Sequence, residues 1–349
     1  RAAPRRAPRV DPNQVQEISV SAKARRSAQF AKSHPAFFAL PLRSSPLRAE
    51  PHAARPSASR VKRSAHGSTE ALFALRQQLS DYPAAQFESA LRSLMGWIAE
   101  AIDADNVIWI GAVRVLDGAP AKNDPSLGWR LRVRQPLRSD PGAYQRQLAE
   151  YYTPDHYGKR TPTYYQRSHE EKREVHVGMT GHAAFVGAGR FRVHRMRDGW
   201  IDFAAFRRTL NYQRYYLEPG ISDRIWIGYP VTCSRESFFL VDRYRQAGAR
   251  RARHFSLREA TLAGDASRGV PELHRRLLLG HGLLTSDKPL SPVERQILRG
   301  LLSGRTEKEV AAAAGRKPAT MHQYVKAIYR HFGVESRAAL MALWLGGLP

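Results

Sequence analysis

Four polar side chains near the carboxyl end of the chain have types and spacings that suit contact with nucleic acid. Gln323, Lys326 and Arg330 stand one, four and eight residues beyond His322, so all four share one face of a helix. Their imidazole, amide, ammonium and guanidinium groups can hydrogen-bond to base edges and phosphates in a major groove. The pattern predicts a DNA-reading helix over about residues 318–331.

An apolar core must hold that helix in place. The opposite face of the helix carries Met321, Val325, Ile328 and Phe332. Ser or Thr followed three residues later by Glu is the capping-box signature of a helix start, and it occurs at residues 291–294 and 306–309. Together with a helix expected over about 336–346, these signals predict a tetrahelical helix-turn-helix domain, which we assign to residues 286–349.

Residues 290–343 read LSPVERQILRGLLSGRTEKEVAAAAGRKPATMHQYVKAIYRHFGVESRAALMAL. The opening Leu-Ser-Pro-x-Glu, the Lys-Glu-Val-Ala and the closing Gly-Val-x-x-Arg make this segment resemble the LuxR-type helix-turn-helix domain of bacterial transcription factors. The resemblance implies that His322, Gln323 and Lys326 enter the major groove of double-stranded DNA. It also implies that Lys308 and Thr320 lie near phosphates of the DNA backbone, and that the protein forms a homodimer through its fourth helix. Arg330 is added from helix periodicity alone.

Two positions depart from the family pattern. Arg316 stands where the family usually keeps an aliphatic core residue, and Lys317 replaces the usual Ser cap. Either the turn differs in geometry, or Arg316 extends outward toward phosphate.

A larger α+β domain is predicted over residues 68–255. Leucines at helical spacing predict helices over about 69–80 and 84–103, and further helices are expected near 141–152 and 200–216. Apolar runs and period-two alternation predict strands near 107–115, 129–133, 191–196, 225–231 and 237–243. Because the last two strands are joined by a short connection, we expect a mostly antiparallel sheet with flanking helices. A helical connector follows over residues 256–285.

The domain over 68–255 resembles the GAF/PAS-like sensory domains that often precede a LuxR-type head. The resemblance rests on the run Tyr-Gln-Arg-Tyr-Tyr at 212–216, Gly-Ile-Ser-Asp at 220–223 and His-Phe-Ser at 254–256. Four aromatic residues, Tyr212, Tyr215, Tyr216 and Trp226, either line a pocket for a small-molecule effector or form core between helix and sheet.

The formal net charge of +25 and the pI near 10.8 favour a polyanionic partner such as nucleic acid. Residues 1–67 are rich in Arg and Pro and poor in acidic and aromatic residues, which predicts a disordered basic tail.

No run approaches the roughly 18–20 apolar residues of a membrane span, so we expect no membrane partner and a cytoplasmic location. The single cysteine, Cys233, lacks a resolving partner and is expected to be a buried, inert thiol rather than a redox sensor.

Residues 169–194 carry four histidines and a glycine-rich stretch, residue types that occur in metal sites and phosphate loops. The spacings of His169, His176, His182 and His194 match no usual zinc-ligand pattern, so we predict no metal and no cofactor. The stretch GMTGHAAFVGAG lacks the Lys-Ser/Thr of a phosphate loop, and no Gly-x-Ser-x-Gly elbow occurs. We therefore predict no enzyme but a DNA-binding transcriptional regulator, with a ligand-binding or enzymatic middle domain as the alternative.

Overall fold

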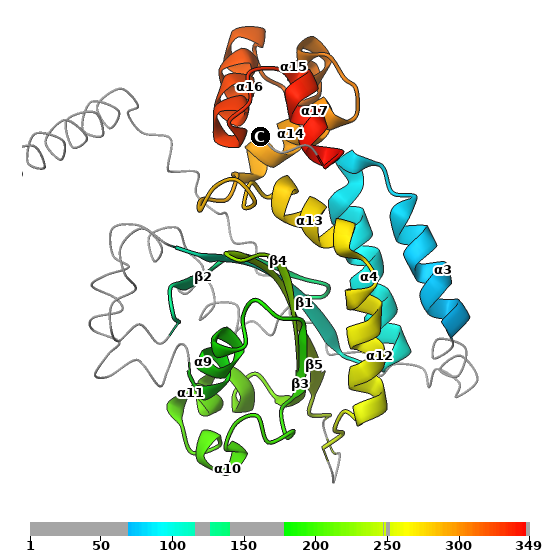
Figure 1. The fold of residues 1–349 in the computed structure, drawn as a ribbon, viewed down its shortest axis with the longest axis vertical. Coiled ribbons are helices and arrows are strands. Elements are labelled where there is room, and N and C mark those ends of the chain that lie inside the picture. Colours follow the sequence, from blue (N-terminus) through cyan, green and yellow to red (C-terminus); the bar gives the residue numbers. More distant parts are fainter. Residues whose placement is uncertain (1–68, 116–125, 140–177, 247, 249–251, 347–349) are drawn as a thin grey trace, which may run out of the picture. The chain divides into compact units, whose positions relative to one another are not determined.

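The computed structural model describes residues 69–115, 126–139, 178–246, 248 and 252–346 (Figure 1). The predicted tail over 1–67, the predicted helix near 141–152, and His169 and His176 lie outside the described residues.

One five-stranded antiparallel sheet organises the first part of the described chain. Its strands are β1 (Asn106–Arg114), β2 (Trp129–Pro136), β3 (Arg192–Arg195), β4 (Ile221–Thr232) and β5 (Arg235–Tyr244), in the spatial order β2-β1-β5-β4-β3. Antiparallel pairing joins every neighbouring pair, including the hairpin β4–β5, which Cys233 and Ser234 close. The predicted antiparallel α+β class is therefore confirmed.

Both faces of the sheet are covered, which explains why β1 is apolar at almost every position. Val107, Trp109 and Val113 point into one core, whereas Ile108 and Ile110 point into another. Successive strand residues face opposite sides, so a strand buried on both sides needs a continuous apolar run.

The first face packs against three helices, α4 (Phe87–Ala101), α12 (Leu257–Arg268) and α13 (Pro271–Gly280), and a 3₁₀ turn over Ala84–Gln86 leads into α4 (Figure 1). A further helix, α3 (Thr69–Ser80), packs on α4 and α12 rather than on the sheet. The end of α13 packs closely against the first residue of α4. A Cβ added at Gly280 would lie only 2.4 Å from the Phe87 ring, so only glycine fits there without a shift of the ring.

The second face packs against short helical pieces: α9 (Gly178–Val186), α10 (Phe203–Phe206), α11 (Leu210–Tyr212) and a π-helical turn over Gln213–Leu217 (Figure 1). The single helix predicted near 200–216 is therefore wrong. The Asp202 carboxylate caps α10 and the Thr209 hydroxyl caps α11, so the chain stops and restarts between them. The sequence reading also missed α9, whose glycines are typical of a loop.

The carboxyl-terminal part is the predicted four-helix domain. It comprises α14 (Pro292–Leu302), α15 (Glu307–Ala313), α16 (Pro318–Phe332) and α17 (Arg337–Trp344). Both predicted capping boxes form, Ser291 with Glu294 and Thr306 with Glu309. Gly315, with φ of +60°, makes the tight turn between α15 and α16, where an L side chain would strain the backbone.

Candidate nucleic-acid interface and its supports

The predicted recognition face exists as one surface of α16. His322, Gln323, Lys326 and Arg330 are all exposed, whereas Met321, Val325, Ile328 and Phe332 are buried in the core of the four-helix domain. The structure therefore brings these four polar side chains together on one helix face, as the spacing predicts.

Lys308 and Thr320 are also exposed, Lys308 in the first turn of α15 and Thr320 in the first turn of α16. Their positions at two helix starts suit phosphate contact, because backbone N–H groups at a helix start favour anions. Their role stays a prediction.

The turn before α16 shows how the two departures are accommodated. Arg316 is exposed rather than in the core, and its backbone N–H donates to the Ala311 carbonyl at 2.9 Å. Lys317 occupies the N-cap of α16 and makes no side-chain capping bond. Arg316 is therefore exposed, as the second alternative predicts, and its contact with phosphate stays a prediction.

Two contacts in this domain escaped the sequence analysis. Nδ1 of His322 lies 3.1 Å from a carboxylate oxygen of Glu307, the first residue of α15. The Arg337 guanidinium donates to the carbonyls of Leu301, in the last turn of α14, and of Arg305, at 2.8 Å for Arg305. The closing arginine of the family pattern thus has a structural role here.

Three of the four predicted pocket aromatics meet on the second face of the sheet. Tyr212 stacks on Tyr216 with centroids 5.7 Å apart, and Tyr216 lies 6.4 Å from Trp226. The Tyr216 hydroxyl lies 3.1 Å from the Thr180 hydroxyl of α9. Tyr215 is buried in the same core. The rings form one aromatic cluster, and a ligand role for it stays a prediction.

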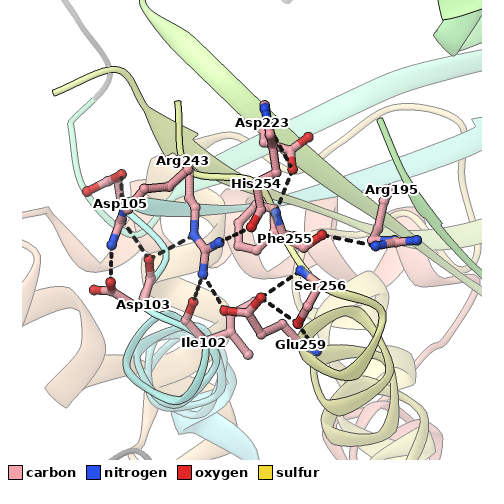
Figure 2. A network of polar contacts seen from close by, with 11 residues as sticks. Ile102, Asp103, Asp105, Arg195, Asp223, Arg243, His254, Phe255, Ser256 and Glu259 are labelled. Atoms are coloured by element: carbon pink, nitrogen blue, oxygen red, sulfur yellow. Dashed lines mark hydrogen bonds and ion pairs between the residues drawn. The ribbon is translucent and has the colours of Figure 1, made fainter. Parts of the chain in front are cut away.

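A polar joint fixes the start of the connector helix α12 (Figure 2). The guanidinium of Arg243, on β5, donates to the carbonyls of Ile102, Asp103 and His254 and to the Glu259 carboxylate. It also lies 4.0 Å from the centre of the Phe255 ring. One side chain therefore ties the sheet and the end of α4 to the first turn of α12.

The four-helix domain also contacts the helices beside the sheet. Arg295 and Arg299 of α14 pair with Glu88 of α4, at 3.5 Å for Arg295. Nε2–H of His331 donates to the Gly282 carbonyl at 2.8 Å, and Arg275 of α13 donates to the Leu343 carbonyl of α17. These contacts involve α4, α13 and the segment after it.

Two fully buried histidines lie on α13 and at its end. Burial lowers the pKa of His274 to about 4 and that of His281 to about 3. His274 bonds the Ser267 carbonyl through Nε2 and the Ser237 hydroxyl through Nδ1, each at 2.8 Å. His281 bonds the Leu277 carbonyl through Nδ1 and the Gln135 amide through Nε2, at 2.9 and 3.1 Å. Both rings are neutral parts of the core.

Cys233 is exposed in the turn between β4 and β5, so its predicted burial is wrong. The turn places it at the end of the hairpin, beyond the covered part of the sheet.

Among the described residues, no group of three His, Cys, Asp or Glu side chains is arranged to hold a metal. Within the same residues, no helix is long and apolar enough to cross a membrane.

Comparison with known proteins finds a family match for the carboxyl-terminal domain. Residues 288–344 match the family model described as bacterial regulatory proteins, luxR family. No curated protein matches the chain. The crystal structure of Escherichia coli SdiA is 12% identical with a TM-score of 0.32, and the match covers 79% of this chain and 95% of SdiA. Residues 288–344, with their four helices and exposed polar face on α16, form a helix-turn-helix domain of the luxR family of bacterial regulatory proteins.

Proposed function

We propose that this protein is a bacterial transcriptional regulator whose α16 reads specific sequences in the major groove of DNA. The observation that carries the proposal is the exposed face formed by His322, Gln323, Lys326 and Arg330, which lies within the luxR-family match. The protein acts as a homodimer on two half-sites about one DNA turn apart. The domain over 68–255 controls the head over 286–349 through the connector over 256–285.

Replacing His322 and Gln323 together by alanine is expected to flatten the preference among DNA sequences. Both side chains lose their base-edge hydrogen bonds, whereas phosphate contacts and the helix core remain. Selection from a random duplex library measures the preference, and the matched control is Gln296→Ala, an exposed residue of α14. An unchanged selected sequence in the double variant would show that this face does not read bases.

Replacing Lys308 by alanine is expected to weaken binding to all sequences alike. One lost phosphate contact lowers the slope of log affinity against log salt by about one unit. Titrations of a specific and a random duplex at several salt concentrations measure both effects. A loss confined to the specific duplex would contradict the phosphate role of Lys308.

The contacts between domains support the proposed control. Arg243 fixes the start of α12, and Glu88 pairs with two arginines of α14. A change in the sheet domain that shifts α12, α13 or α4 would therefore change how the DNA-binding head is held.

The second candidate function is that the domain over 68–255 binds a small-molecule effector or acts as an enzyme. The aromatic cluster of Tyr212, Tyr216 and Trp226 favours it. Mass spectrometry of the purified full-length chain, before and after denaturation, distinguishes a domain that binds a small molecule from one that only mediates assembly. A released small molecule supports a sensory domain, whereas its absence supports an assembly domain.

A further inference from the structure

We propose that Glu307 is a specificity-determining positioning residue, because it fixes which hydrogen-bonding group His322 offers to DNA. The inference rests on the proposed function and deepens it. It concerns the contact between the first turn of α15 and the recognition face of α16.

The geometry leaves Glu307 free for this contact. Two carboxylates stand in the first turn of α15, and that of Glu309 accepts from the Thr306 backbone N–H at 2.7 Å and hydroxyl at 3.0 Å. Glu309 therefore serves the helix cap. The Glu307 carboxylate extends to α16 instead, 3.1 Å from Nδ1 of His322.

A second observation places the same carboxylate against α16. Burial, and then the charge of Glu307, raise the pKa of Tyr329, which lies two helical turns after His322. The side chains of Glu307 and His322 are 43% and 51% exposed, so the pair lies at the surface of the reading face and not in the core.

An ionised carboxylate can only accept hydrogen bonds, so Nδ1 of His322 must carry the hydrogen. In a neutral ring, Nε2 is then left with its lone pair and can only accept. In the major groove, the groups that donate are the exocyclic amino groups of adenine and cytosine. The opposite tautomer would donate from Nε2 to guanine or adenine N7.

The neighbours on the face make an acceptor useful. Lys326 and Arg330 can only donate, and the Gln323 amide can do either. With Nδ1 held by Glu307, His322 supplies the acceptor that the two cations lack. The structure thus assigns to Glu307 a part in base selection, without contact between Glu307 and a base.

The test compares the full-length wild type with Glu307→Gln at pH 8.5. Glutamine keeps the shape but can also donate to Nδ1, so both tautomers become possible. Glu335→Gln removes an equal charge from an exposed residue of the same domain and is the matched control. The base pair that His322 reads is the one at which His322→Ala loses its preference.

Duplexes carrying base analogues at that base pair give the decisive result. Deleting the exocyclic amino group is expected to weaken wild-type binding about fivefold, the worth of one net hydrogen bond, and 7-deaza substitution is expected to have no effect. The change in affinity caused by each analogue is compared with the change that the same analogue causes for His322→Ala. The analogue's own influence on the duplex then cancels. Glu307→Gln is expected to show a smaller amino-group effect than the wild type, and Glu335→Gln to keep the full effect.

Nitrogen-15 NMR of the imidazole adds a readout that folding alone does not change. Nδ1 is expected to carry the hydrogen in the neutral ring of the wild type and to share it with Nε2 in Glu307→Gln. An equal amino-group effect in both proteins, or an Nε2–H tautomer in the wild type, overturns the inference. If the wild type selects no sequence at all, the proposed function itself fails, which is a distinguishable outcome.

Discussion

Replacing Arg243 by alanine is expected to lower the free energy of unfolding by about 3 kcal/mol, because a buried charged group that donates several hydrogen bonds is lost. The arginine is 4% exposed. Its removal leaves the carbonyls of Ile102 and His254 and the Glu259 carboxylate without this donor. Against a total stability of about 5–15 kcal/mol for a folded protein, this loss is large.

Urea unfolding followed by circular dichroism measures the loss, and Arg245→Ala is the matched control. Arg245 is exposed and lies two residues further along the chain. Arg243→Lys keeps the charge but lacks the planar fork that reaches several acceptors at once, so it is expected to recover only a part. A change below about 1 kcal/mol in Arg243→Ala would mean that the joint contributes little to stability.

The same arginine illustrates what the sequence could not predict. Arg243 contacts Ile102 and Asp103, which lie far from it along the chain, on the end of α4. Sequence periodicity identified the strand that carries Arg243 but not the partners of its side chain. Such partners depend on how β5 packs against α4 and α12, and no local pattern encodes that packing.

Local patterns, by contrast, predicted the DNA-binding domain well. The capping boxes at Ser291 and Thr306 form as predicted, because each needs only a hydroxyl and a carboxylate three residues apart. The buried and exposed faces of α16 follow the helical period. The contact of His322 with Glu307 was missed, since it joins two helices across the turn.

The second face of the sheet was the hardest to predict. The stretch over 200–216 has helical composition, but Asp202 and Thr209 each cap a new short helix and so break it. The glycine-rich α9 was missed because glycine is unfavourable within a helix. Cys233 was expected in the core from its residue type, and the hairpin turn instead leaves it exposed.

Acidification from pH 6.5 to 5 is expected to lower the free energy of unfolding by about 3 kcal/mol through His274 and His281. Burial lowers the pKa of these residues to about 4 and about 3 in the folded chain, whereas an unfolded histidine titrates near 6.5. In this window the unfolded state binds the protons and the folded state does not. The contribution of the two histidines is therefore full only well above pH 6.5, and it falls as the pH falls.

Urea unfolding at half-unit pH steps measures the slope, and His274→Gln and His281→Gln are each expected to remove about half of this contribution. Burial also lowers the pKa of His194, which adds to the slope in the same direction. Burial raises the pKa of Asp223, and a carboxylic acid with a raised pKa opposes the trend. Because ordinary Asp and Glu side chains titrate below pH 5, a pH range that ends at 5 limits their contribution to the slope.

The hydrogen bonds of His274 show why its protonation is costly. The Ser267 carbonyl can only accept, so Nε2 carries the hydrogen and Nδ1 accepts from the Ser237 hydroxyl. The Ser237 oxygen in turn accepts from the Trp109 indole N–H at 2.7 Å. A proton on Nδ1 would take from the Ser237 hydroxyl hydrogen its acceptor inside the core. It would also bring a charge into the core beside Tyr229, whose ring stacks on His274 at 4.0 Å. Equal pH slopes for the wild type and both glutamine variants would mean that these rings take up protons without unfolding, and that the core between α13 and the sheet admits water.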